Sequence, residues 1–211
     1  MKGVRRTMTK LPLIPPPPLD SMDDSFVVLG RFQPFHKGHA AMIKSAEDYR
    51  SENYPNLNLV IAIGSSNRPQ TLQNPWSYNE RAEMISSWLR NEENIDAKIV
   101  SIPDIDDPPN WVSHAEGYHG HSGVFFSSDD YSCKLYQDSG WITVSTPLVD
   151  RSRFEGWRVR ETARMLSTIN DEEAIRMVLG ESLPQSVVDY LISNDSLKRL
   201  AFLGEGGEPV G

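Results

Sequence analysis

Short, continuously apolar runs recur along the chain, separated by longer stretches in which apolar residues have helical spacing. The runs at residues 26–29, 56–64, 97–102, 123–126 and 141–145 have the length and β-branched content of strands buried on both faces. Strands that alternate with helices predict βαβ units with right-handed crossovers. We therefore expect an α/β fold, a Rossmann-like, doubly wound, five-stranded parallel sheet followed by a C-terminal helical segment.

The same pattern divides the chain into three parts. Residues 1–24 are rich in proline and acidic residues and lack apolar periodicity, which predicts a disordered or polyproline II tail. Residues 25–166 hold all five predicted strands and should form one α/β domain. Residues 167–211 have helical spacing and are expected to be a helical extension packed on that domain.

Composition narrows the classes of protein that remain. The 211 residues carry a formal net charge of −8, which argues against a partner such as nucleic acid that is bound through bulk positive charge. No apolar run is long enough to span a membrane, and the basic N-terminus has no apolar stretch behind it. The single cysteine, Cys133, excludes an intramolecular disulfide and fits a cytoplasmic protein.

Residues 26–43 contain the clearest candidate for a functional site. A strand, a tight loop and a helix follow one another there, a geometry that aims free N–H groups and a positive helix end at an anion. His36 and His39 share one helix face, and Gly38 between them indicates a close approach to the backbone. A surface histidine pair and a metal site are the alternatives, but residues 26–46 offer no further metal ligand type.

Three polar clusters follow predicted strands: Gly30 and Arg31, then residues 65–68 with Arg68, then residues 127–130 with Ser127, Ser128 and Asp129. Ligands of open parallel sheets bind beyond the carboxyl ends of the strands. We therefore expect these clusters to lie together around a ligand.

The run Gly-Arg-Phe-Gln-Pro-Phe-His-Lys-Gly-His at residues 30–39 resembles the H-x-G-H signature of the nucleotidylyltransferase superfamily. The full run is most similar to archaeal-type nicotinamide mononucleotide (NMN) adenylyltransferases. Asn74-Pro75 followed by Glu80-Arg81 resembles a second motif of that family. Residues 102–114 resemble its nicotinamide-binding loop, whose tryptophan falls on Trp111.

A fourth motif departs from the family pattern. Residues 155–160, in an arginine-rich segment, resemble the second phosphate motif of the family, and Gly156 and Arg160 keep their places. Glu155 stands where the family has a hydroxyl residue, and Trp157 replaces the threonine after Gly156. Two hydroxyl donors to phosphate are thereby lost and a carboxylate is added.

The resemblance implies a nucleotidyltransferase fold of the HUP type and transfer of AMP from ATP to NMN, giving NAD and pyrophosphate. ATP and NMN would be the small-molecule partners, Mg²⁺ would travel on the ATP phosphates rather than on protein ligands, and the oligomeric state stays open, a homo-oligomer included. The implied catalytic residues are His36, His39 and Arg160. The implied ATP-binding residues are Gly30, Arg31, Phe32, Gln33, Phe35, Gly38, Ser127, Ser128, Asp129, Gly156 and Arg160. The implied NMN-binding residues are Arg68, Asn74, Arg81, Asp104 and Trp111.

Alternatives remain at this stage. Another phosphate acceptor (pantetheine phosphate, FMN or a polyol phosphate) could use the same scaffold, or the chain could be a non-catalytic nucleotide-binding module whose second phosphate motif has decayed. Trp111 is either a stacking surface for a pyridinium ring or an anchor for its loop. The aspartates at 104, 106 and 107 are either substrate contacts or a solvated turn.

Overall fold

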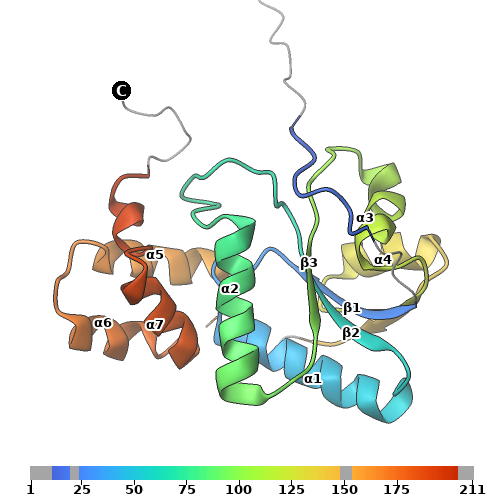
Figure 1. The fold of residues 1–211 in the computed structure, drawn as a ribbon, viewed down its shortest axis with the longest axis horizontal. Helices are drawn as coiled ribbons and strands as arrows, with labels where there is room; N and C mark the ends of the chain where they lie inside the picture. The colour runs from blue at the N-terminus through green and yellow to red at the C-terminus, as the bar shows by residue number, and fades with distance from the viewer. Residues whose placement is uncertain (1–10, 20–23, 148–153, 204–211) are drawn as a thin grey trace, which may run out of the picture.

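The computed structural model describes residues 11–19, 24–147 and 154–203. Within them, five parallel strands form one sheet in the order β3-β2-β1-β4-β5 (Figure 1). The strands are β1 (Ser25–Gly30), β2 (Asn58–Ile63), β3 (Lys98–Ser101), β4 (Gly123–Ser127) and β5 (Ile142–Ser145). The predicted doubly wound parallel sheet is confirmed.

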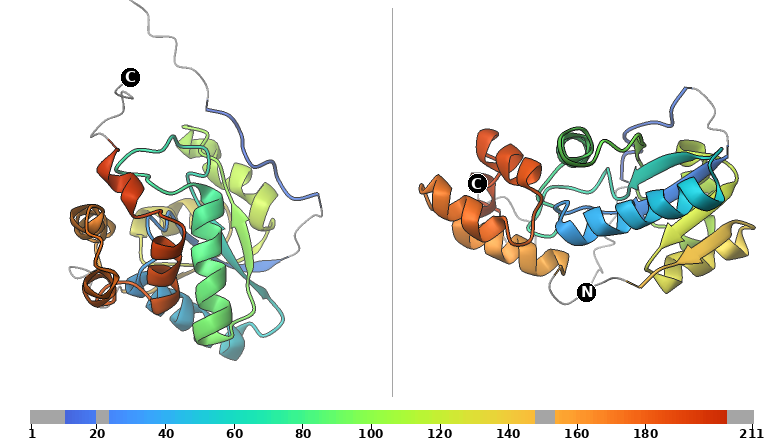
Figure 2. Two further views of the ribbon diagram at one scale, coloured as in Figure 1. Left: turned by 60° about the vertical axis from the view of Figure 1, so that its left-hand side comes forward. Right: turned by 90° about the horizontal axis from the view of Figure 1, so that it is seen from below.

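Helices cover both faces of the sheet (Figure 2). Their bounds are α1 (Lys37–Asn53), α2 (Tyr78–Trp88), α3 (Trp111–His119), α4 (Asp130–Asp138), α5 (Gly156–Leu166), α6 (Glu172–Leu179) and α7 (Gln185–Ser193). A π-helical turn, Leu89–Glu93, extends α2, and 3₁₀ turns occur at Pro108–Asn110 and Lys198–Ala201. No helix in the described part of the chain is long and apolar enough to cross a membrane.

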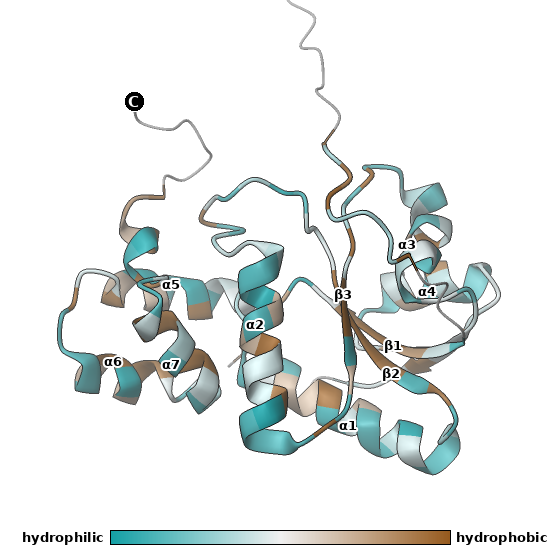
Figure 3. Cartoon of the chain, in the orientation of Figure 1, coloured by the Kyte–Doolittle hydropathy of each residue, from teal (hydrophilic) through white to brown (hydrophobic). Residues whose placement is uncertain are grey.

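Alternate residues of the strands feed two separate cores. Phe26 and Val28 of β1 face the layer of α1, α2 and the C-terminal helices, whereas Val27 faces α3 and α4. This alternation follows from the twofold repeat of a strand, and both sides are fully buried. In Figure 3 the strands are correspondingly brown, while teal residues lie on the outer sides of the helices.

The helices after residue 166 share the larger core. Ile175 of α6 and Val187 of α7 pack in the same cluster as Phe26. An ion pair between Arg199 and Glu80, 2.7 Å apart, ties the last 3₁₀ turn to the first turn of α2. The exact boundary at residue 166 stays a prediction, but the apolar contacts across it are continuous.

Residues 11–19, part of the predicted disordered or polyproline II tail, contact the domain. They form no helix or strand, yet three side chains of the domain donate hydrogen bonds to their carbonyl groups. Tertiary contacts, which apolar periodicity does not report, therefore hold this segment on the domain. The rest of the predicted tail, residues 1–10 and 20–23, lies outside the described residues.

Candidate active site

Two cavities adjoin at the carboxyl end of β1. The larger, of about 670 Å³, lies between α3 and α4, and the smaller, of about 410 Å³, lies beside the first turns of α1 and α5. Five residues line both cavities: Leu29, Gly30, Arg31, Ser127 and Asp129. The clusters that follow β1 and β4 are thus brought together, as predicted, and they form the junction of the two cavities.

His36 and His39 line the smaller cavity and cap helix α1 reciprocally. The backbone N–H of His39 donates to Nδ1 of His36 at 3.2 Å, and the backbone N–H of His36 donates to Nδ1 of His39 at 3.3 Å. The two rings stack with their centroids 3.5 Å apart. Because both Nδ1 atoms accept, each neutral ring carries its proton on Nε2, which leaves an N–H donor on each ring.

Both histidines are neutral at pH 7 in the free protein. Burial lowers the pKa of His36 to about 4, and the positive charge of Arg160 adds to the effect. Burial and the neighbouring His36 hold the pKa of His39 well below its usual range. The pair therefore offers hydrogen-bond donors rather than fixed positive charges until an anion arrives.

Two arginines supply charge near the histidines. Arg31 is exposed and lines both cavities, which places a cation at their junction. Nη1 of Arg160 donates to the carbonyl of Gln33 at 2.7 Å, so α5 is tied to the loop before α1. Burial and the charge of Arg31 lower the pKa of Arg160 from its ordinary value.

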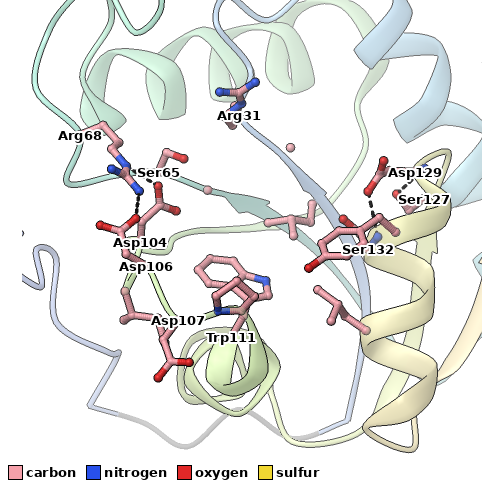
Figure 4. A pocket seen from close by; sticks show the side chains of 17 residues that line it. Arg31, Ser65, Arg68, Asp104, Asp106, Asp107, Trp111, Ser127, Asp129 and Ser132 are labelled. Carbon is pink, nitrogen blue, oxygen red and sulfur yellow. Dashed lines mark hydrogen bonds and ion pairs between the residues drawn. The ribbon is translucent and has the colours of Figure 1, made fainter.

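The larger cavity has one acidic wall (Figure 4) and is lined by two aromatic side chains, Trp111 and Tyr131. Arg68 lies on the acidic wall and pairs with Asp104, 2.5 Å away, and with Asp106. Burial alone would lower the pKa of Arg68, but these two carboxylates raise it. Trp111, the first residue of α3, presents its indole to the cavity opposite the α4 wall.

Comparison with known proteins identifies the family. Residues 27–112 match the model of the cytidylyltransferase-like family. A nicotinamide-nucleotide adenylyltransferase of Haloarcula marismortui is 30% identical over 177 residues, 84% of this chain and 85% of that protein. The enzyme of the same name from Thermoplasma volcanium is 30% identical over 183 residues, 87% of this chain and 94% of that protein. This chain belongs to the nicotinamide-nucleotide adenylyltransferase family.

Solved structures agree on the fold. A bifunctional NMN adenylyltransferase/ADP ribose pyrophosphatase from Francisella tularensis, complexed with AMP and a manganese ion, matches with a TM-score of 0.55 and 23% identity over 86% of this chain. This chain spans about half the length of that protein, 53%. A nicotinic acid mononucleotide adenylyltransferase of Plasmodium falciparum matches with a TM-score of 0.50 and 11% identity over 83% of this chain.

Three residues of the histidine motif support the site from inside the protein and do not face a cavity. Phe32, Gln33 and Phe35 are buried and line neither cavity. The Phe32 and Phe35 rings lie 4.9 and 6.0 Å from the His39 ring, and the Gln33 side chain exchanges two hydrogen bonds with the backbone of Trp76. These side chains hold His39 and the loop in place, and their contact with ATP stays a prediction.

Neighbouring side chains of the protein leave no room for a side chain at Gly38. A Cβ at this position would lie 2.8 Å from Cβ of Phe154 and 3.2 Å from the His36 ring. The close approach predicted from this glycine therefore comes from the segment before α5. It brings the two phosphate motifs of an adenylyltransferase, far apart in sequence, into contact.

Arg81 has a structural role that the sequence did not predict. Its side chain is only 1% exposed and lines neither cavity. The guanidinium donates to the carbonyls of Arg31 at 2.7 Å and Gly64 at 2.8 Å, and to those of Ser65 and Ser77 at 3.2 Å. Burial lowers its pKa to about 10, so it stays charged at neutral pH. Four of its five N–H donors are thus on carbonyl groups of the protein, so Arg81 anchors these loops, and its contact with NMN stays a prediction.

Asn74 is also placed away from the acceptor. It closes a turn with Thr71, whose hydroxyl accepts from the Asn74 backbone N–H at 3.3 Å, and it lines neither cavity. Asn74-Pro75 instead sets the start of α2, where Ser77 and Glu80 form the predicted capping box. The second family motif thus shapes the loops and does not face the larger cavity.

The altered second phosphate motif does face the smaller cavity. Glu155 precedes α5 and pairs with Nε of Arg158 at 2.9 Å, without capping the helix. Trp157 is 55% exposed, with the Arg158 guanidinium 4.9 Å from its ring centre. Gly156 and Arg160 line the same cavity. The arginines at 151 and 153 lie outside the described residues.

One aromatic residue that lines the larger cavity was missed by the sequence analysis. Tyr131, in the first turn of α4, is 63% exposed and lines the larger cavity that Trp111 also lines. Its neighbour Asp129 caps α4 by accepting from the backbone N–H of Ser132 at 2.8 Å. The serine- and aspartate-rich segment after β4 contained Tyr131, but nothing local distinguished its ring from a surface residue.

Proposed function

We propose that this chain transfers the adenylyl group of ATP to NMN, forming NAD and pyrophosphate. The observation that carries the proposal is the pair of cavities joined at the end of β1, with the histidine motif in one, Trp111 in the other and Arg31 between them. A reaction between two nucleotides needs two adjoining sites with a cation where the reacting phosphates meet. The names of the relatives supply the identity of the acceptor.

ATP is assigned to the smaller cavity. The N-terminal ends of α1 and α5 line it, and helix N-termini favour phosphate groups. Its contacts would come from the backbone of Gly38 and Gly156, the charge of Arg160 and the Nε2–H donors. Four further proposed ATP-binding residues lie at the junction, Gly30, Arg31, Ser127 and Asp129, and Ser128 lines the smaller cavity alone.

NMN is assigned to the larger cavity. The indole of Trp111 offers a face for the pyridinium ring, a planar cation. Asp104 is proposed as a polar contact, and Arg68 as the cation that fixes the acidic wall and adjoins the nucleotide. This arrangement points the mononucleotide phosphate toward Arg31 and the end of β1.

The chemical step is an in-line displacement. An oxygen of the NMN phosphate forms a bond to the α-phosphorus of ATP, and the bond from that phosphorus to the bridging oxygen of the β-phosphate breaks, with pyrophosphate as leaving group. Such transfers need positioning and charge stabilisation more than a nucleophilic side chain. Arg31 and the His36 and His39 donors would stabilise the charge on the α-phosphoryl oxygens, and Arg160 the charge on the leaving group.

Mg²⁺ is proposed to enter the site bound to the phosphates of ATP. Among the described residues no group of three or more His, Cys, Asp or Glu side chains could hold a metal ion. Mg²⁺ usually keeps several waters and is held mainly by substrate phosphates. Bound there, Mg²⁺ would neutralise phosphate charge, and Asp129 and Glu155, which line the smaller cavity, could bind its waters.

The proposal is tested by incubating the full chain with ATP, Mg²⁺ and one acceptor at a time, and separating the products by chromatography. NMN should give NAD and pyrophosphate in equal amounts, whereas pantetheine phosphate, FMN and a polyol phosphate should give no adenylylated product. ATP binding by calorimetry without product from any acceptor would instead identify a regulatory nucleotide-binding module.

The acidic wall predicts a preference within the pyridine nucleotides. Nicotinic acid mononucleotide has the same ring as NMN with one added negative charge, which would lie near Asp104 and Asp106. Like charges in a partly buried site repel, so kcat/KM should be lower for the acid than for the amide. Equal or higher kcat/KM for the acid would place the ring elsewhere in the cavity.

A further inference from the structure

Residues 11–19 lie beside the acceptor half of the site. Figure 1 shows this segment, in dark blue, passing next to the loop after β2 and the region of α3. Its carbonyl groups accept three hydrogen bonds from the domain: from Oη of Tyr118 to Pro15 at 3.0 Å, from Oγ of Ser66 to Ile14 at 2.7 Å and from Nδ2 of Asn67 to Pro12 at 2.9 Å. The segment lines neither cavity, and these hydrogen bonds come from the loop after β2 and from α3.

Asn67 connects this segment to the acidic wall. Its Nδ2 group also donates to the carbonyl of Asp104 at 2.8 Å, and its Oδ1 accepts from the backbone N–H of Asp104 at 2.8 Å. An amide NH₂ has two hydrogens, so the bonds to Pro12 and Asp104 use both. The side chain of Asn67 is thus oriented by the N-terminal segment and in turn holds the backbone of Asp104.

The position of Asp104, held by Asn67, affects the larger cavity. Its carboxylate accepts from Nε of Arg68, 2.5 Å away, and both side chains line that cavity. The loop at residues 65–68 and the loop at residues 103–107 therefore meet at Asn67. The segment is also suited to hold this position, because four consecutive prolines at residues 15–18 restrict its backbone before it binds.

We propose that residues 11–19 are a positioning element of the NMN-binding half of the site, acting through Asn67 on Asp104 and Arg68. The inference rests on the proposed function, since its readout is the affinity for NMN. It makes the N-terminal segment specific to the acceptor, because the three residues that donate hydrogen bonds to it, Ser66, Asn67 and Tyr118, do not line the smaller cavity assigned to ATP.

The test compares four proteins: the full chain, a chain lacking residues 1–19, Asn67→Ala in the full chain, and both changes together. Removing the segment should raise KM for NMN by about 5-fold, the effect of one lost hydrogen bond, with KM for ATP and kcat changed less than about 2-fold. Asn67→Ala should raise KM for NMN at least as much. In the double variant the truncation should add little, because coupled groups are not additive.

Leu19→Ala is the matched control, since this side chain in the same segment is fully exposed and should leave both KM values unchanged. Equal rises in both KM values, additive effects of the two changes, or a truncated protein with the KM of the full chain would overturn the inference. If the truncated protein does not fold, a chain lacking residues 1–12 decides: it loses the Pro12 carbonyl that orients Asn67 but keeps the bonds at Ile14 and Pro15, and it must raise KM for NMN and spare ATP. A full chain that makes no NAD would instead overturn the proposed function.

Discussion

At the scale of single residues, the histidine pair has two functions, carried by different nitrogen atoms of the same rings. His36 is the N-cap of α1 and His39 its partner in the capping box, so both Nδ1 atoms have structural hydrogen bonds. The Nε2–H groups remain for substrate. A change at His36 therefore affects helix stability and chemistry together, and the two effects have to be separated by the choice of side chain.

His36→Asn separates them, because asparagine is a good N-cap but cannot place a donor at the position of Nε2. The variant should keep the melting temperature within a few degrees of the parent and lose about 10²-fold or more in kcat, as expected for a lost transition-state donor. His121→Asn, at an exposed histidine, is the control and should change neither quantity. Near-normal kcat with a raised KM for ATP would reject the role in the chemical step.

Trp111 is the residue that tests the acceptor. If its indole stacks on the pyridinium ring, Trp111→Ala should lose about 1–2 kcal/mol of NMN binding free energy, and Trp111→Phe should recover part of it. Trp157→Ala is the matched control, since that exposed indole lines the smaller cavity and should spare NMN. A fall in melting temperature with an unchanged Kd for NMN would make Trp111 a loop anchor.

At the scale of elements, Arg81 joins α2 to the ends of two strands. The helix begins at the Ser77–Glu80 capping box, which directs the next side chain toward the sheet. The Arg81 guanidinium donates hydrogen bonds to carbonyl groups just after β1 and β2. These carbonyls belong to the loops that carry Arg31 and Arg68. The geometry of the junction between the cavities depends on this buried cation.

Arg81→Ala should lower the free energy of unfolding by about 2 kcal/mol or more, because buried carbonyls lose their donors. It should also reduce kcat/KM for both substrates, unlike a residue that contacts only NMN. Arg90→Ala is the control on the turn after α2: its ion pair with Glu83 is largely exposed and should contribute less than about 1 kcal/mol. Urea unfolding and steady-state kinetics measure both effects. If Arg81→Ala weakened NMN binding alone and left the free energy of unfolding unchanged, Arg81 would contact NMN directly.

At the scale of the whole molecule, buried histidines in both core layers make folding sensitive to acid. Buried His36 lies on the α1 side with the half-buried His39 beside it, and buried His119 lies on the other side, where its Nε2 is 2.7 Å from Oη of Tyr136. Burial lowers the pKa of His119 to about 4. The unfolded chain then binds more protons than the folded chain between pH 6.5 and 4, so stability is greatest above that window and falls within it.

The free energy of unfolding should therefore decrease by on the order of 2 kcal/mol for His119 alone between pH 7 and pH 5. His119→Gln should reduce this pH dependence, whereas His121→Gln should leave it unchanged, as measured by urea unfolding at the two pH values. An identical difference in the His119 variant and the parent would show that His119 is protonated without cost in the folded protein.

The amino-acid sequence by itself determined the features that depend on neighbours a few residues apart. Apolar runs fix strands, a serine and glutamate three apart fix the start of α2, and the His36, Gly38 and His39 spacing fixes the capped first turn of α1. These patterns also predicted that the clusters after β1 and β4 would meet at one edge of the sheet, because parallel strands end on the same side.

Only the tertiary structure decided which side chains of those motifs face the substrates. Arg81, Gln33 and Asn67 are polar residues in loops or first turns, and their partners are carbonyl or backbone groups up to 55 positions away. Local spacing reports the direction of a side chain only within its own element. Whether a polar group meets ligand, backbone or a proline-rich segment depends on how distant loops pack, and that packing placed Arg81 inside the protein and residues 11–19 against the acceptor loop.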